Sequence, residues 1–164
     1  MKPGDIILTH SSGLVGWAIR AGERIRDPLN TTQWNHAGVI IDRFGATVEA
    51  LGSGVKFSNV DKHPVRVVID TGLSDADRLQ VVDWAISVVG RPYGYLTIAS
   101  IALDLLSPAF FHFRSGETLI CSQLAAKALE HGGWRCPKID TSHVMPSDLA
   151  KWLLTSPTQK STGS

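Results

Sequence analysis

Short apolar runs, each bounded by Gly, Pro, Asp or Asn, dominate residues 4–70. Several are rich in β-branched residues, and an apolar run of this length between turn residues is typical of a β-strand. The predicted strands are GDIILTH (4–10), NHAGVIID (35–42), ATVEAL (46–51), GVKFSN (54–59) and PVRVVID (64–70).

The second half of the chain repeats apolar residues at helical spacing. Ser74 and Asp77 resemble a capping box and begin a predicted helix over residues 75–90. The face of this helix expected to point inward carries Leu79, Val82, Ile86 and Val89. A further helix is predicted to begin near Cys121 and to stop at Gly132 and Gly133.

Two shorter helices are predicted, SSGLVGWAIRAG (11–22) and MPSDLAKWLLT (145–155). Strands gather early in the chain and helices late. This order favours an α+β fold, with a small antiparallel sheet or barrel packed against helices, over alternating βαβ units.

The composition, 43% hydrophobic and 19% charged over 164 residues, is that of a globular protein. We expect one domain over residues 1–155 and a disordered tail over 156–164. The net charge of +1 gives no reason to expect a nucleic-acid partner. The start, MKPGDIILTH, lacks the apolar stretch of a signal peptide, so we expect a cytoplasmic protein or one delivered by other machinery, such as that of a phage.

The longest apolar stretch, Tyr95–Phe111, is interrupted by Asp104 and Pro108. It is too short and too broken to cross a bilayer, so no transmembrane segment is expected. A core-facing helix or a lid helix fits this stretch better.

Cys121 has two interpretations, because it lies where polar sequence gives way to an apolar helix. Free cysteine is often a small buried hydrophobe. At the amino end of a helix, however, the unpaired N–H groups favour the thiolate, which is the nucleophilic form of cysteine. The second interpretation requires a base.

His36 is the histidine that stands in a strand of almost entirely apolar neighbours, and Glu49 is a carboxylate within the next strand. In an antiparallel hairpin, a connection of Ile41 to Phe44 would pair His36 directly with Glu49 on one face. A three-residue connection would place the two side chains on opposite faces. The remaining histidines are expected to be solvated or capping residues, namely His10, His63, His112, His131 and His143.

If that register holds, His36 would serve Cys121 as a base and Glu49 would orient the ring, while the Cys121 N–H would bind an oxyanion. Metal binding by Cys, His and Glu is a weaker alternative. The other cysteine, Cys136, lies fifteen positions further on, beyond the glycine stop.

The motifs GDIIL, WNHAGVII, VEALGSGV, GRPYGY, ICSQLAAKAL and MPSDLA follow one another between Gly4 and Leu154. In this order they resemble the circularly permuted NlpC/P60 papain-like proteins, most closely the YiiX/YaeF-like branch, with the lecithin:retinol acyltransferase group as relatives. The resemblance implies a papain-like core with no cofactor and no metal. It also implies that Cys121 is the nucleophile, His36 the base and Glu49 the orienting residue.

Tyr93, in GRPYGY, matches a tyrosine that lines the site in this family, where it would contact the substrate or the oxyanion. A packing role for Tyr93 is the alternative.

The resemblance therefore implies a cysteine hydrolase of the peptidase, amidase or acyl-transfer type. Its substrate would be a peptide, peptidoglycan, or a lipid amide or ester. If the apolar stretch at 95–111 is a lid, it favours a lipophilic substrate. The alternative function is a non-catalytic binding or structural module on the same fold, for example in a larger phage or envelope assembly. Nothing in the sequence indicates the oligomeric state.

Overall fold

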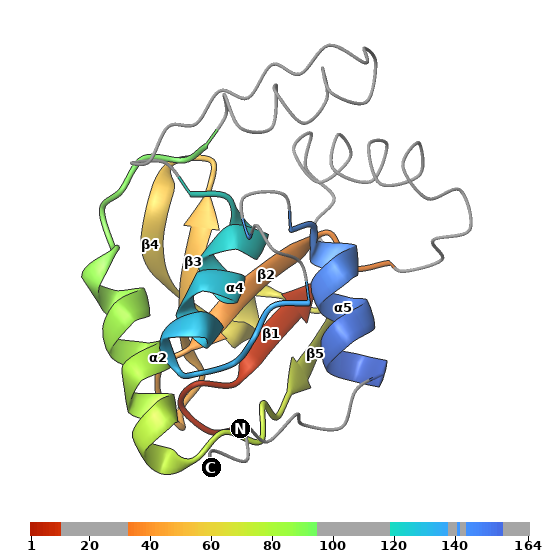
Figure 1. The fold of residues 1–164 in the computed structure, drawn as a ribbon. Coiled ribbons are helices and arrows are strands. Elements are labelled where there is room, and N and C mark those ends of the chain that lie inside the picture. The colour runs from red at the N-terminus through yellow and green to blue at the C-terminus, as the bar shows by residue number, and fades with distance from the viewer. Residues whose placement is uncertain (11–32, 95–118, 138–140, 142–143, 156–164) are drawn as a thin grey trace, which may run out of the picture.

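The protein is described by a computed structural model over residues 1–10, 33–94, 119–137, 141 and 144–155 (Figure 1). Its centre is a five-stranded antiparallel sheet in the order β4-β3-β2-β1-β5. The strands are β1 (Ile6–Thr9), β2 (His36–Ile40), β3 (Ala46–Leu51), β4 (Gly54–Asn59) and β5 (Arg66–Ile69). The described helices are α2 (Asp75–Ser87), α4 (Cys121–His131) and α5 (Pro146–Thr155), with a 3-10 turn η1 (Val60–Lys62) after β4.

The α+β prediction is confirmed, with a small open sheet and three helices among the described residues. All the predicted strands form, most of them slightly shorter than the apolar runs that predict them. The helix predicted over 11–22, the apolar stretch 95–111 and the tail 156–164 lie outside the described residues. In the part of the chain that the structure describes, no helix is long and apolar enough to cross a membrane.

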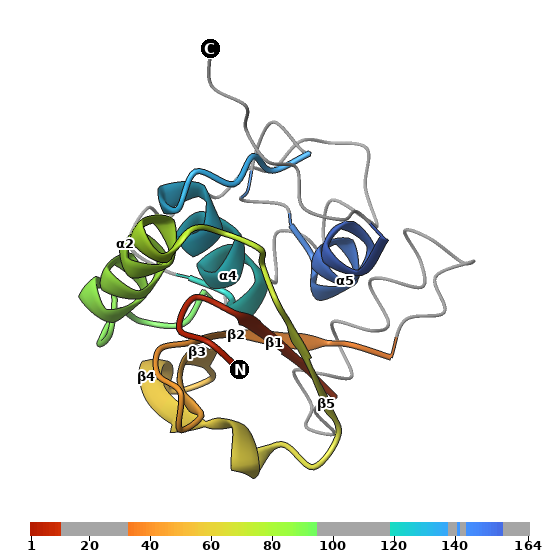
Figure 2. The ribbon, with the colours of Figure 1, turned by 90° about the horizontal axis from the view of Figure 1, so that it is seen from below.

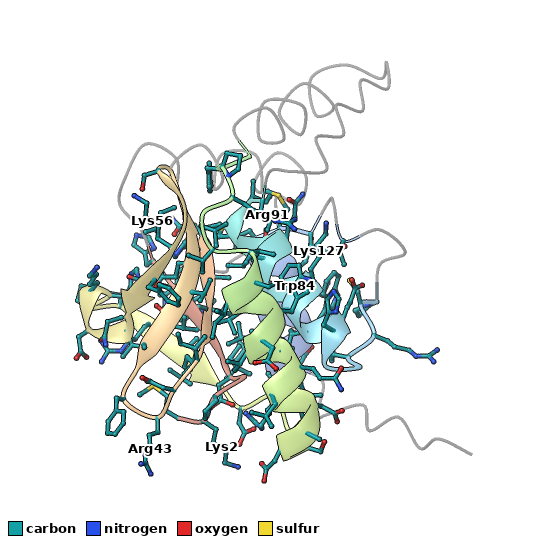
Figure 3. All side chains as sticks on the ribbon, turned by 90° about the vertical axis from the view of Figure 1, so that its left-hand side faces the viewer. Lys2, Arg43, Lys56, Trp84, Arg91 and Lys127 are labelled. Atoms are coloured by element: carbon teal, nitrogen blue, oxygen red, sulfur yellow. The ribbon has the colours of Figure 1, made fainter. Side chains whose placement is uncertain are left out.

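The described helices lie on one side of the sheet, and the turn that contains η1 lies on the other (Figure 2). Side chains fill the space between the sheet and α4, which packs against β2, β3 and α2 (Figure 3). The sheet face toward the helices carries fully buried apolar residues such as Leu8, Val39 and Val48. A second, smaller cluster of Ile7, Ile40 and Val60 covers the other face.

The inward face predicted for α2 is confirmed at Val82, which is buried, and at Val89, which packs against the core, but it is wrong at the other two positions. Leu79 and Ile86 are 61% and 41% exposed, whereas Val81 and Ala85 are fully buried. Neighbouring residues lie about 100° apart around a helix axis, so an error of one residue is enough to turn the Leu79 and Ile86 side chains to solvent. The buried face instead includes Arg78, a residue that an apolar pattern cannot select.

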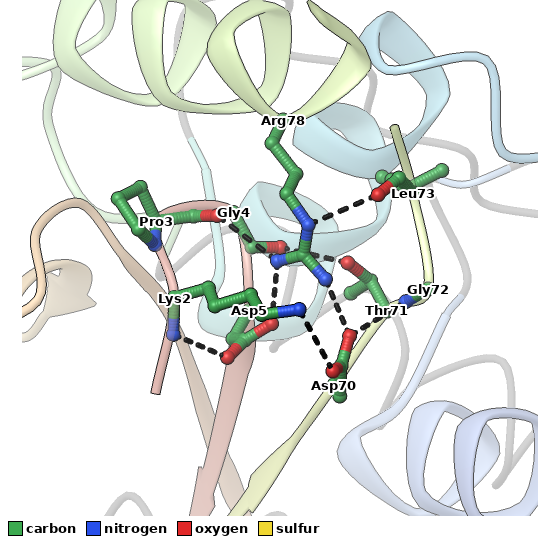
Figure 4. Close-up of polar contacts among 9 residues, drawn as sticks. All are labelled: Lys2, Pro3, Gly4, Asp5, Asp70, Thr71, Gly72, Leu73 and Arg78. Atoms are coloured by element: carbon green, nitrogen blue, oxygen red, sulfur yellow. Dashed lines mark hydrogen bonds and ion pairs between the residues drawn. The ribbon is translucent and has the colours of Figure 1, made fainter. Parts of the chain in front are cut away.

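Arg78 is buried because it closes a polar network at the base of the fold (Figure 4). Its Nη1 atom donates to Asp5 Oδ1 at 2.6 Å and to the carbonyl of Pro3 at 3.0 Å. Its Nη2 atom pairs with the more exposed Asp70, which follows β5. A hydrogen bond from the Gly72 N–H lowers the pKa of Asp70, and the charges of Arg78 and Lys2 add to this effect against the opposing effect of burial. The network ties the start of β1 and the end of β5 to α2.

Candidate functional site

Cys121 is the first residue of α4, as the sequence predicts. The preceding residue, Ile120, has extended backbone angles, and its N–H donates to Gln123 Oε1 at 3.3 Å. The helix ends at His131 with Gly132 as its C-cap, and Gly133 takes a φ of +79°. Cys121 is 1% exposed, and it packs with Ile120 and Leu124 in the same core.

His36 is the first residue of β2, and its ring lies beside Glu49. The ring Nε2 lies 2.8 Å from Glu49 Oε2. The charge and hydrogen bond of Cys121 raise the pKa of His36, so the thiol lies close to the ring. Because Nε2 is engaged by Glu49, Nδ1 is the nitrogen that remains for the sulfur. The imidazole therefore lies between the thiol and the carboxylate.

The register that we predicted for β2 and β3 is wrong, although the shared face is right. Glu49 lies opposite Gly38, not opposite His36. The ladder is thus displaced by two residues from the predicted pairing. Because side chains alternate with period two along a strand, this displacement leaves His36 and Glu49 on the same face. The side chain of Glu49 reaches His36 diagonally.

The hairpin loop explains the displacement. Asp42 Oδ1 accepts the N–H groups of Phe44 and Ala46 at 2.8 and 2.9 Å, and Gly45 takes a φ of +93°. The N–H of Ile41 donates to the carbonyl of Ala46 at 2.9 Å, so Ile41 continues the ladder instead of starting the loop. An aspartate that binds backbone N–H groups two and four residues on fixes the loop at residues 42–45.

Glu49 is fully buried and accepts hydrogen bonds from three side chains. Besides His36, Thr47 Oγ1 donates to Oε1 at 2.6 Å. The Nε2 of His63 lies 3.0 Å from Oε2 and 3.1 Å from Oε1. A buried carboxylate needs such donors in place of water.

His63 is the site residue that the sequence analysis missed, since it was expected to be solvated or capping. It follows η1, where Asn59 Oδ1 accepts the N–H of Asp61 at 2.9 Å and turns the chain back. This turn places the ring of His63 beside that of His36, with a centroid distance of 5.8 Å. The Asn59 cap is a readable turn signal, but it does not specify which strand the following histidine meets.

Burial lowers the pKa of His36, but the charge and hydrogen bond of Cys121, together with those of Glu49, outweigh it and raise the pKa to about 10. For Glu49, burial raises the pKa, and the hydrogen bond and charge of His36, helped by Thr47 and His63, outweigh it and lower the pKa to about 2. The geometry therefore favours an imidazolium held beside a carboxylate.

Tyr93 is buried and forms an isolated parallel bridge with Leu119, two residues before Cys121. The backbone of Tyr93 thus lies next to the extended segment that precedes α4. The role that the resemblance implies for its hydroxyl remains a prediction. Neither cysteine forms a disulfide.

Other histidines lie apart from this cluster. His10 Nδ1 bonds the carbonyl of Gln33 at 2.8 Å, and the ring of His131 stacks on Trp84. The predictions for His112 and His143 fall outside the described residues.

The ring nitrogens of His36 and His63 and an oxygen of Glu49 all lie within 4.8 Å of one another. Two imidazoles and a carboxylate form a donor set that zinc accepts in proteins. For these atoms to bind a metal, however, both Nε2 atoms would have to give up the protons that they direct at Glu49.

No protein-family model matches the chain, and no curated protein matches it. Among solved structures, it is similar to the metalloprotein yiiX from Escherichia coli O157:H7, a DUF1105 protein. The TM-score is 0.57 and the identity 21%, over 82% of this chain and 68% of yiiX. The chain has a yiiX-like fold. At 21% identity, this similarity supports a shared fold and nothing further.

Proposed function

We propose that the protein is a cysteine hydrolase of the permuted NlpC/P60 papain-like type, cleaving an amide or ester through Cys121, His36 and Glu49. The observation that carries this proposal is the position of the His36 ring, which lies 2.8 Å from Glu49 and close enough to Cys121 for the charge of the cysteine to raise the pKa of His36. A cysteine that merely fills the core requires no imidazole beside it. A nucleophilic cysteine requires a group that holds its thiolate and moves a proton.

In the first half of the proposed reaction, the Cys121 thiolate attacks the carbonyl carbon and forms a C–S bond. The bond to the leaving nitrogen or oxygen breaks as the His36 imidazolium gives that atom its proton. In the second half, neutral His36 takes a proton from water, and the water oxygen attacks the thioester. The carboxylic acid product leaves, and the thiolate and imidazolium are restored.

Glu49 acts in this proposal by fixing the ring orientation and stabilising the imidazolium. The backbone N–H of Cys121 is the proposed oxyanion donor, because the first N–H groups of a helix have no intrahelical acceptor. Tyr93 is the proposed substrate contact ahead of the cysteine. The substrate class proposed is a peptide, peptidoglycan or a lipid amide or ester.

The proposal is tested with p-nitrophenyl esters of increasing acyl length and with peptidoglycan fragments. Wild-type protein should release the leaving group and carry an acyl mass on Cys121. Cys121→Ser and Cys121→Ala should lose on the order of 10⁴-fold or more in kcat while keeping the wild-type circular dichroism. Cys136→Ser is the matched control and should retain activity. If Cys121→Ser keeps most of the activity, the nucleophile assignment is wrong.

The second candidate is a metal site, favoured by the convergence of His36, Glu49 and His63. A zinc ion held there would supply a Lewis acid. The two candidates differ in their response to chelation. The hydrolase proposal expects hydrolysis to survive treatment with EDTA. A metal function expects stoichiometric zinc by elemental analysis, loss of activity with EDTA and loss of zinc in His63→Ala.

A further inference from the structure

The carboxylate of Glu49 is held from two sides. His36 approaches Oε2 alone, whereas the Nε2 of His63 lies almost equally far from the two oxygens, at 3.0 and 3.1 Å. One N–H shared between both oxygens fixes the carboxylate plane as well as its distance. No other histidine among the described residues contacts Glu49.

His63 is itself anchored at its backbone. Its N–H donates to the carbonyl of Val60 at 3.1 Å, and its own carbonyl accepts from Arg66 Nη1 at 2.8 Å. The side chain of His63 is 16% exposed, compared with 10% for His36 and 0% for Glu49. The ring thus reaches from a fixed turn to a carboxylate that has no contact with solvent.

The charge of the proposed catalytic state explains why such a donor matters. A thiolate, an imidazolium and a carboxylate carry one net negative charge in a buried site. Thr47 and His63 are the described side chains besides His36 that donate to this carboxylate. Without His63, Glu49 would lose a charge-assisted hydrogen bond, and its carboxylate could turn toward Thr47 and away from His36.

We infer that His63 is a positioning residue that acts through Glu49, so that the site is a relay of four residues, Cys121–His36–Glu49–His63. This inference rests on the proposed function, because it assigns His63 a role in holding the imidazolium that sustains the nucleophile. His63 touches neither the thiol nor the substrate in this account.

The test measures the rate of Cys121 alkylation by iodoacetamide at neutral pH, in chelator-treated protein, together with kcat and KM on the ester probe. His63→Ala should slow alkylation and lower kcat on the order of tenfold, with KM unchanged, as expected for loss of one hydrogen bond to a charged group. His63→Gln should restore most of both rates, because the glutamine Nε2 can reach the position of the histidine Nε2. His10→Ala is the matched control and should change neither rate.

A double-mutant cycle separates positioning from packing. If His63 acts through Glu49, His63→Ala should have no further effect on alkylation in a Glu49→Gln background. Equal effects in both backgrounds would overturn the inference, as would wild-type rates in folded His63→Ala. His36→Ala tests the proposed function separately. If His36→Ala leaves the alkylation rate unchanged, both the proposed function and the inference are wrong. If His36→Ala slows alkylation but His63→Ala does not, only the inference is wrong.

Discussion

Gly38 lies directly opposite Glu49 in the ladder between β2 and β3, and a Cβ atom at position 38 would come within 2.7 Å of Glu49 Cγ. The same atom would lie 3.2 Å from the Ile7 side chain. The missing side chain at position 38 therefore leaves the space that the Glu49 side chain crosses to reach His36. A glycine inside a strand usually weakens it, and here it permits a close approach.

Gly38→Ala should displace the Glu49 carboxylate, destabilise the fold by about 1–3 kcal/mol and lower kcat. Denaturant unfolding and ester hydrolysis measure the two effects. Glu49→Ala supplies the control, because it removes the Cγ atom with which the new Cβ atom would clash. In this background, Gly38→Ala should destabilise the fold less than it does in the wild type. Equal costs in both backgrounds would show that the clash does not involve Glu49.

Glu49→Gln should lower kcat less than His36→Ala does. The amide keeps the shape of the carboxylate but loses its charge, whereas the alanine removes the base itself. Steady-state kinetics on one ester probe compare the two variants, with thermal unfolding as a check on folding. A larger loss in Glu49→Gln would contradict the roles assigned to the two residues.

The stability of the fold should depend on pH at both ends of the range, with opposite signs. The pKa of His36 is raised in the fold from 6.5 to about 10, so its stabilisation is complete below pH 6.5 and is lost as the pH rises through about 10. The pKa of Glu49 is lowered from 4.5 to about 2, so its stabilisation is present above pH 4.5 and is lost as the pH falls through about 2.

Urea unfolding across this pH range checks both limbs. The wild-type free energy of unfolding should fall as the pH rises toward about 10, and His36→Gln should largely abolish this alkaline decline. Cys121→Ala should reduce it, since Cys121 provides the largest of the effects that raise the pKa of His36. An alkaline decline identical in all three proteins would contradict the contact between Cys121 and His36.

Much of the site could be predicted from the sequence because its signals are local. A carboxylate between Val48 and Ala50, and a histidine in an apolar strand, both stand out against strand composition. Their shared face follows from period-two alternation, which survives a register error of two residues. The register itself depends on Asp42, which accepts hydrogen bonds from backbone N–H groups of the loop. The pattern of apolar residues does not encode these hydrogen bonds.

The residues that escaped prediction depend on long-range contacts. Arg78 is buried because Asp5 lies opposite it, 73 positions away in the sequence. His63 joins Glu49 from a turn whose direction is set by the sheet. Amphipathic periodicity assigns both residues to solvent, because it treats every charged or polar side chain as unpartnered.

Within the network around Arg78, Asp5 should contribute more to the stability of the fold than Asp70. The side chains of Arg78 and Asp5 are 5% and 3% exposed, whereas that of Asp70 is 59% exposed. Asp5→Asn should therefore cost about 3–5 kcal/mol, because it removes the charge of the buried carboxylate that pairs with the buried guanidinium. Asp70→Asn is the matched control and should cost no more than about 1 kcal/mol. Equal costs by urea unfolding would refute this assignment.

The central claim is that His36 sustains a thiolate at Cys121, and ultraviolet absorbance of the thiolate tests it most directly. The measurement needs no reagent to reach a sulfur that is 1% exposed. The spectrum of Cys121→Ala, subtracted at each pH, removes the contribution of Cys136. The wild-type difference spectrum at neutral pH should show thiolate absorbance, and His36→Ala should lack it. Identical difference titrations for wild type and His36→Ala would contradict the account.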